Sequence, residues 1–233
     1  MGGPPTTPPL VFVADVEDPA LEAGDEHHLH RVLRLRPGNE LTVADGHGRW
    51  RTCRLAPGGR PEPVAAVEVE RAPEPAVTVA FAVTKGERPE LAVQKLTELG
   101  VDRIVPFRAE RSVARWDGER ATRHVERLRR VVREAAMQSR RPLLPQLDDV
   151  VDFAAAAALP GAVLAEREGE PPSLDQPTIL VGPEGGWSDD ERSTGLPRVT
   201  LGPHVLRAET AAMAAGFVMV ALRHGTVTHR GRC

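Results

Sequence analysis

The chain has 233 residues, 41% of them hydrophobic and 27% charged, the balance of an ordinary globular protein. Its 30 lysines and arginines and 33 aspartates and glutamates give a formal net charge of −3, which excludes a broadly polybasic protein but allows a local basic patch. Two cysteines, Cys53 and Cys233, are too few for a disulfide framework or a four-cysteine zinc site, so we expect a reduced, cytoplasmic compartment. The longest apolar run, 211–222, is too short to cross a bilayer.

Short apolar runs separated by turn residues occupy the first third of the chain. They predict strands at residues 10–14, 40–45, 49–55 and 63–71. Asp45-Gly46 is a hairpin signal, and Leu29, Val32 and Leu33 share one face of a helix expected at about 25–35. We expect residues 1–72 to form a small β-barrel domain, joined by a stiff proline-containing linker to the remainder.

Strand and helix patterns alternate from residue 76 to the end of the chain. Strands are predicted at 76–83, 101–107, 161–166, 177–182 and 198–202. Helices are predicted at 89–99, 118–139 and about 208–223. This rhythm predicts an α/β domain over 76–233 with a parallel sheet covered on both faces. Ligands of such domains lie at the carboxyl ends of the strands.

A glycine-rich loop, Gly182-Pro183-Glu184-Gly185-Gly186, directly follows one of these strands. Ser188 and Glu191 then form a capping box that starts a helix with three acidic residues in its first turn. Phosphate-binding loops instead present bare N–H groups and a lysine, and the chain contains no GxGxxG motif. The loop therefore favours a ligand that is not mainly phosphate, although a plain strand–turn–helix connection has the same spacing.

A second loop, residues 201–210, also follows a strand and precedes a helix. That helix is apolar on nearly all sides, so it lies in the core or meets a partner subunit.

The segment 103–141 is strongly basic, with twelve arginines and five acidic residues. This local excess is typical of a polyanion site, but arginines spaced three and four apart also decorate solvated helix faces. No nearby set of carboxylate and cysteine side chains completes a metal site around the cluster His27-His28-x-His30, and we expect no metal site. Base stacking or a surface role suits these histidines better.

Several segments together resemble the RsmE family of bacterial small-subunit ribosomal RNA methyltransferases, within the knotted SPOUT superfamily. They are VGPEGGWSDDE (181–191), LGPHVLRAETA (201–211), QKLTELGV (94–101) and AAMQSRRPLLP (135–145). The N-terminal HHLHRVLRLRPGN (27–39) and ADGHGRW (44–50) resemble that family's PUA-like RNA-binding barrel. One departure is Met137, where the family more often carries a glutamate, so no catalytic role of that glutamate applies here.

The resemblance implies a homodimer with a C-terminal trefoil knot. It also implies S-adenosylmethionine as methyl donor and N3 of one uridine in 16S rRNA as acceptor. The donor would lie among three loops and contact Leu164, Ala165, Glu166, Gly182, Pro183, Glu184, Gly185, Leu201, Gly202, Val205, Leu206, Arg207 and Thr210. We expect RNA contacts at His28, Arg31, Arg34, Arg111, Arg140 and Arg141.

Methylation at N3 requires that the uracil lose a proton, so a general base or a stabilising positive charge is needed. Glu209 and Glu184 are the candidate bases, and Arg207 or Arg141 could stabilise charge on the uracil oxygens. Lys95 and Glu98 are explained at least as well by a structural salt bridge. Two alternatives stay open: a non-catalytic rRNA-binding assembly factor, and a knotted methyltransferase that acts on tRNA.

Overall fold

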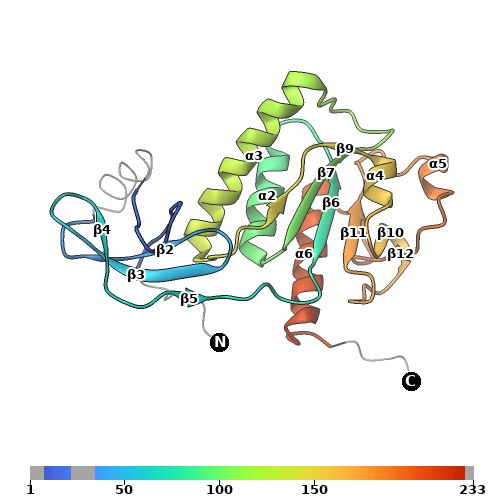
Figure 1. The fold of residues 1–233 in the computed structure, drawn as a ribbon. Helices are drawn as coiled ribbons and strands as arrows, with labels where there is room; N and C mark the ends of the chain where they lie inside the picture. Colours follow the sequence, from blue (N-terminus) through green and yellow to red (C-terminus); the bar gives the residue numbers. More distant parts are fainter. Residues whose placement is uncertain (1–7, 22–34, 229–233) are drawn as a thin grey trace. The chain divides into compact units, whose positions relative to one another are not determined.

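The structure is a computed structural model that describes residues 8–21 and 35–228. The predicted helix at about 25–35 falls almost entirely outside these residues. Contacts between Cα atoms divide the chain into two compact units (Figure 1). The first comprises residues 1–72 and 133–144, and the second comprises residues 73–132 and 145–233. The sequence predicts a first domain that ends at residue 72, and it does not predict that residues 133–144 belong to that unit.

The first unit contains a five-stranded sheet. Its strands are β1 (Leu10–Phe12), β2 (Glu40–Ala44), β3 (Arg49–Leu55), β4 (Pro61–Pro63) and β5 (Glu68–Val69). β2 and β3 form the predicted hairpin around Asp45-Gly46, and β1 pairs in parallel with β2. Alternate residues of these strands build a core that includes Val11, Leu41 and Cys53.

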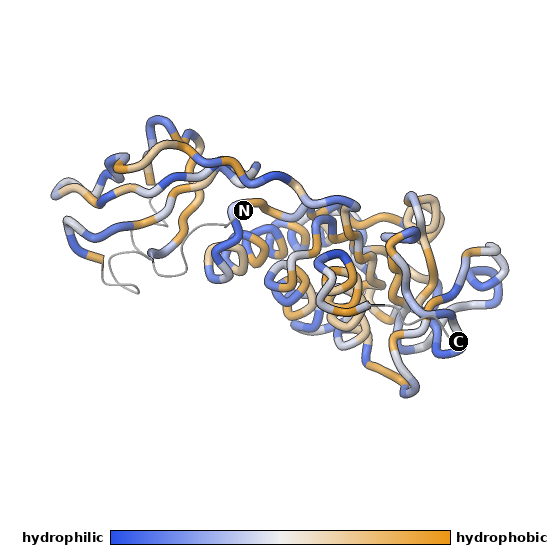
Figure 2. The backbone as a smooth tube through the Cα atoms, turned by 90° about the horizontal axis from the view of Figure 1, so that it is seen from below, coloured by the Kyte–Doolittle hydropathy of each residue, from blue (hydrophilic) through white to orange (hydrophobic). Residues whose placement is uncertain are grey.

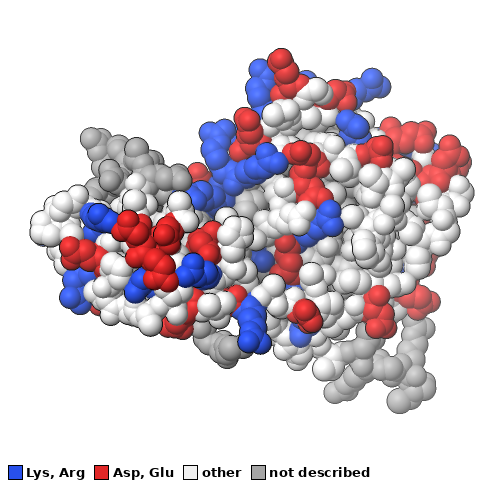
Figure 3. All heavy atoms as spheres, viewed as in Figure 1, with Lys and Arg blue, Asp and Glu red and all other residues white. Residues whose placement is uncertain are grey.

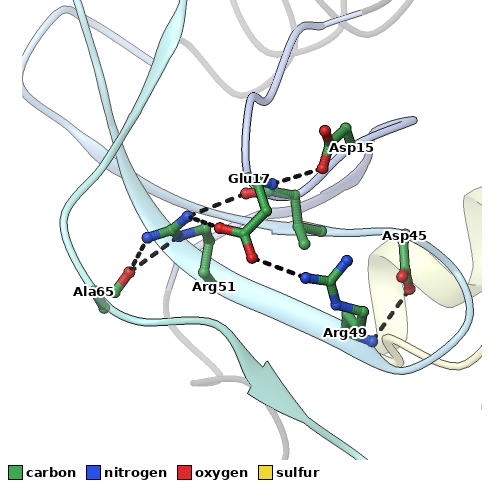
Figure 4. Close-up of polar contacts among 7 residues, drawn as sticks. Asp15, Glu17, Asp45, Arg49, Arg51 and Ala65 are labelled. Carbon is green, nitrogen blue, oxygen red and sulfur yellow. Dashed lines mark hydrogen bonds and ion pairs between the residues drawn. The ribbon is translucent and has the colours of Figure 1, made fainter.

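The single strand predicted at 63–71 is instead divided into β4 and β5. A polar network at the surface explains the interruption, because Arg51 donates from Nε and Nη2 to the carbonyl oxygen of Ala65 at 3.0 and 2.7 Å (Figure 4). This carbonyl is therefore not available to a neighbouring strand. Glu17 accepts from both Arg49 and Arg51, so one carboxylate ties the segment before the hairpin to β3.

The second unit contains a sheet of seven strands, all paired in parallel. Its main path is β12 (Arg198–Val199), β10 (Ala162–Glu170), β11 (Thr178–Val181), β6 (Thr78–Ala82), β7 (Arg103–Arg108) and β8 (Gln146–Leu147), and β9 (Val151–Asp152) also pairs with β7. Helices α2 (Arg88–Leu99), α3 (Gly118–Ser139), α4 (Phe153–Ala157), α5 (Asp189–Arg192) and α6 (Ala208–Arg223) connect them. The predicted parallel α/β arrangement is confirmed.

The central strands are buried on both faces, as their continuous apolar runs predict. Ala80, Phe107 and Leu180 pack on one face together with Ala156 of α4. Their neighbours, such as Val79 and Ile179, are also fully buried and face the other side, because successive strand residues alternate. There α6 packs on β6 and β11, and α2 packs on α6. Hydrophobic and hydrophilic residues alternate along the helical coils in Figure 2.

Candidate functional site

A cavity of about 590 Å³ lies at the carboxyl ends of β10 and β11, where the sequence predicts a ligand site. Its wall is formed mainly by three separate segments, residues 165–168 of β10 and the two glycine-bearing loops found in the sequence. Nine of the predicted donor-binding residues line it: Ala165, Glu166, Gly182, Pro183, Glu184, Leu201, Gly202, Val205 and Leu206. The two loops, about twenty residues apart in the sequence, therefore meet in one pocket.

Four predicted donor contacts do not line this cavity. Leu164 is fully buried in the core beneath it. Gly185 lies against Arg111. Arg207 occupies the N-cap of α6 with an exposed side chain, and Thr210 is exposed in the first turn of that helix. Their contribution to ligand binding stays a prediction.

The indole of Trp187 fixes the glycine loop against the rest of the pocket. Its ring is buried, stacks on Phe107 with ring centroids 6.0 Å apart, and donates from Nε1 to the carbonyl oxygen of Ala165 at 3.2 Å. A Cβ at Gly182 would lie 2.9 Å from this indole. Glycine is therefore needed at 182 for close packing, a reason that the motif alone does not reveal.

Glu166 is held at the cavity wall by two arginines that the sequence argument did not anticipate. Its carboxylate accepts from Arg192 Nε at 2.9 Å and pairs with Arg198 Nε at 3.1 Å. The side chain of Glu166 is only 13% exposed, so the two cations compensate for a largely buried charge. The arginines belong to α5 and β12, and no local pattern relates them to residue 166.

A second charged cluster joins the glycine loop to α2 and α6. Arg88 Nη1 forms a short contact with Glu184 Oε1, and Arg88 Nε lies 3.9 Å from Glu209 Oε1. Arg207 Nη1 lies 4.0 Å from Glu184 Oε1. The second carboxylate oxygen of Glu209 is buried and has no hydrogen-bond partner within the described part of the chain. Both candidate bases, Glu184 and Glu209, therefore lie next to the guanidinium of Arg88, a residue that the sequence motifs do not indicate.

The capping box is present as predicted and has an additional role. Ser188 Oγ accepts from Glu191 N at 3.2 Å, and Glu191 Oε2 accepts from Ser188 N at 2.8 Å. The other oxygen of Glu191 accepts from Glu110 N at 2.9 Å. This buried carboxylate therefore ties the loop after β7 to the segment that follows the glycine loop.

Several arginines of the basic segment 103–141 are paired with acidic side chains. Arg103, Arg108, Arg127 and Arg129 form ion pairs with nearby carboxylates. Figure 3 accordingly shows acidic atoms among the basic ones along α3. The hydrogen bond to Asp148 raises the pKa of Arg103. Arg127 and Arg129 belong to α3, so part of the charge excess consists of ordinary ion pairs on an exposed helix face, the alternative that the sequence left open.

His124 of α3 stacks on buried Trp116, with ring centroids 4.1 Å apart. Burial, reinforced by Arg120, lowers the pKa of this imidazole. We therefore expect His124 to be neutral at pH 7, which reduces the positive charge at the start of α3.

Two of the predicted RNA contacts, Arg140 and Arg141, lie in the first unit just after α3. Arg140 has a φ of 60°, a left-handed conformation that glycine normally adopts at this position of a helix end. Its Nη1 donates to the carbonyl oxygen of Met137 at 3.2 Å, and burial lowers its pKa. Met137 itself packs against two apolar clusters of the first unit. His28, Arg31 and Arg34 lie outside the described residues.

Lys95 Nζ lies 2.9 and 2.8 Å from the two carboxylate oxygens of Glu98, the salt bridge expected from their spacing. Within residues 8–21 and 35–228, no group of three or more histidine, cysteine or acidic side chains could hold a metal ion. Across those same stretches, every helix is too short or too polar to span a bilayer.

Comparisons with known proteins place both halves of the chain. A family model described as an RNA methyltransferase domain matches residues 71–220, and one described as an RNA methyltransferase PUA domain matches residues 22–66. The ribosomal RNA small subunit methyltransferase E of Mycobacterium bovis is 38% identical over 221 residues, covering 84% of each chain. The protein of the same name from Bacillus subtilis is 30% identical over 236 residues, covering 89% of this chain and 91% of its own.

Solved structures agree with this assignment. The ribosomal RNA small subunit methyltransferase E of Neisseria gonorrhoeae, bound to S-adenosyl methionine, has a TM-score of 0.74 and 30% identity, covering 92% of this chain and 98% of its own. A methyltransferase of Legionella pneumophila in complex with the same molecule has a TM-score of 0.80 and 26% identity, covering 92% and 97%. The predicted PUA-like N-terminal domain and parallel α/β C-terminal domain are thereby confirmed, and the chain belongs to the ribosomal RNA small subunit methyltransferase E family of RNA methyltransferases.

Proposed function

We propose that this protein methylates N3 of one uridine in the 16S rRNA of the small ribosomal subunit, with S-adenosylmethionine as donor. The observation that carries the proposal is the cavity in which the two glycine-bearing loops meet. Family membership supports the reaction class, since the named relatives are methyltransferases of small-subunit ribosomal RNA. The choice of uridine N3 rests on the resemblance of the sequence motifs to this family.

The residues of the cavity suit the proposed donor. Its volume of about 590 Å³ lies within the usual range for small-molecule sites. Its wall carries apolar side chains together with three carboxylates and three arginines. S-adenosylmethionine, when bound, supplies a methyl group on positively charged sulfur, and it also carries an ammonium and a carboxylate. A wall of mixed charge with close backbone approach at Gly182 matches such a molecule.

The residues next to the cavity suit an acceptor that must lose a proton. Glu209 and Glu184 are the candidates that take the N3 proton, and Arg207 can stabilise negative charge on the uracil oxygens. Glu184 is paired with Arg88, whereas one oxygen of Glu209 has no partner among the described side chains, which favours Glu209 as the base. Arg141 of the first unit stays a candidate for charge stabilisation and, with Arg140 and Arg111, for RNA contact.

We further propose a homodimer with a C-terminal trefoil knot, acting in the cytoplasm. Phe217 of α6 is 53% exposed although that helix is apolar on most sides, and burial against a second copy would remove this surface from water. The knot rests on the resemblance of the segments 181–191 and 201–211 to that family.

The decisive experiment uses small subunits from a strain that lacks the modification. The purified protein and the donor are added, and mass spectrometry locates the methylated nucleotide. N3-methyluridine at one position is the expected product. Another methylated nucleotide would refute the substrate assignment. Calorimetry that detects no donor binding would instead favour a non-catalytic assembly factor. Methylation of tRNA would favour a methyltransferase that acts on tRNA.

A further inference from the structure

The loop between β7 and α3, residues 109–117, is fixed beside the donor cavity yet presents an unusual set of exposed side chains. It leaves the carboxyl end of a central strand, the edge at which ligands bind in parallel α/β sheets. Arg111, Val113 and Arg115 are exposed, whereas Ala114 and Trp116 are buried. From residue 113 the side chains therefore alternate between solvent and core.

Several contacts hold this loop in place. Glu110 N donates to the buried carboxylate of Glu191 at 2.9 Å. Ser112 N donates to the carbonyl oxygen of Ala109 at 3.1 Å, and Ala109 N donates to Ser112 Oγ at 3.3 Å. At the other end, Trp116 is 3% exposed and stacks on His124. The exposed side chains thus stand on an anchored backbone.

The loop touches the glycine loop directly. A Cβ placed on Gly185 would lie 3.3 Å from Arg111 Cβ and 3.5 Å from the Arg111 carbonyl oxygen. The flanking residues Glu184 and Gly186 line the cavity. Arg111 therefore lies at the rim of the proposed donor site. An acceptor atom must approach a bound methyl group to about 3–3.5 Å, so nucleotides next to the acceptor have to pass this rim.

The charges of the loop indicate what binds there. Arg111 and Arg115 form no ion pair with any residue in 8–21 or 35–228, in contrast to Arg108 and Arg129 on either side of them. The loop contains two acidic residues, Glu110 and Asp117, and Asp117 is paired with Arg108. Val113, which lies between Arg111 and Arg115 in the sequence, is 72% exposed and presents an apolar side chain to solvent. Arginine forks bind phosphates, and an apolar side chain can contact a base or sugar.

We propose that Arg111 and Arg115 bind backbone phosphates of the substrate RNA beside the methylated nucleotide, with Val113 contacting the base or sugar between them. This inference rests on the proposed function and adds to it the surface that seats the RNA at the donor cavity. The anchoring of the loop by Glu191 means that the contact is rigid before RNA arrives, which lowers the entropic cost of binding.

The test compares Arg111→Ala and Arg115→Ala with Arg129→Ala, which removes an arginine that is also exposed but is paired with Asp149. Fluorescence anisotropy with a labelled 16S rRNA fragment measures RNA affinity over a series of salt concentrations, and calorimetry measures S-adenosylmethionine affinity. We expect each loop variant to weaken RNA binding about fivefold or more and to reduce the salt slope by about 0.7, the value for one phosphate contact to a single strand. Donor affinity should stay within about twofold, as should both affinities of the control.

Three outcomes would overturn the inference. If the wild type methylates small subunits but the loop variants bind RNA like Arg129→Ala, the RNA passes elsewhere and the proposed function stands. If Arg111→Ala loses donor affinity as well as RNA affinity, the loop supports the pocket rather than the substrate. If the wild type neither binds RNA nor methylates it, the proposed function itself fails, and this inference falls with it.

Discussion

The indole of Trp187 occupies the space in which a side chain at Gly182 would lie. A Cβ there would come within 2.9 to 3.1 Å of three indole atoms. The ring cannot easily retreat, because it stacks on Phe107, packs against Phe153 and is tied to the carbonyl of Ala165. Tight packing, rather than an unusual backbone angle, therefore explains the first glycine of the motif.

Gly182→Ala should for this reason damage the donor pocket. Overpacking of a fixed core position costs about 1–3 kcal/mol and displaces the loop. We expect donor affinity to fall about tenfold or more in calorimetry, with a lower midpoint of thermal unfolding. Gly58→Ala is the matched control, since a Cβ at Gly58 meets nothing within 4 Å. An unchanged donor affinity in Gly182→Ala would show that the Gly182–Trp187 packing does not shape the pocket.

Arg88→Ala should affect catalysis more than stability. Its ion pair with Glu184 is partly exposed, with 35% of the Arg88 side chain and 48% of Glu184 accessible, so this pair contributes under about 1 kcal/mol to folding. The contact with Glu209 is longer, at 3.9 Å. Removing Arg88 leaves Glu184 and Glu209 as neighbouring carboxylates without their shared cation. We expect the methylation rate to fall about tenfold while the unfolding temperature changes little.

Arg88→Lys keeps the charge but cannot span both carboxylates with a guanidinium fork, so it should recover only part of the rate. Arg54→Ala, which breaks the exposed pair with Glu40, serves as the control. A large loss of stability in Arg88→Ala with a normal rate per folded molecule would contradict the prediction.

Glu191→Gln should loosen both segments that meet at this side chain. Each oxygen of Glu191 accepts a backbone N–H, from Ser188 and from Glu110, and an amide presents an NH₂ group to one of them. Leaving a buried N–H unpaired costs about 1–3 kcal/mol, so chemical denaturation should show a loss of that size. RNA affinity should fall with it, because the loop of Arg111 loses its anchor. Unchanged stability would mean that these hydrogen bonds are not made in solution.

The sequence predicts the elements of the second unit well because their signals are local. The helix at 118–139, the apolar strand after residue 76 and the capping box at Ser188 and Glu191 all depend on residues a few positions apart. The strand predicted at 63–71 is wrong in its middle, since the guanidinium of Arg51 takes the carbonyl of Ala65 from fourteen residues away. No periodicity contains that information.

The same difference between local signals and contacts of distant residues applies to the candidate site. The glycine motifs indicate the loops, and the order of strands and helices predicts that they share one edge of the sheet. Arg88, Arg192 and Arg198 escape prediction because each pairs with a carboxylate from another element. The contact of Gly185 with Arg111 likewise joins two residues that were predicted separately, one for the donor and one for RNA. Such pairs depend on the order of the strands within the sheet, which the spacing of residues along the chain does not specify.

The thiol of Cys53 should make stability depend on pH in the alkaline range. Burial raises its pKa to about 11, from an ordinary value of 9.0. The folded state therefore retains a proton that the unfolded state loses above pH 9, so the free energy of unfolding falls as pH rises toward 11. The loss approaches about 1.4 kcal/mol per pH unit within this window and is absent below pH 8. Denaturation of the wild type and of Cys53→Ala from pH 8 to 11 measures it, and the variant, although less stable at pH 8, should show a flatter profile. Parallel profiles for the two proteins would mean that the thiol ionises equally readily in both states.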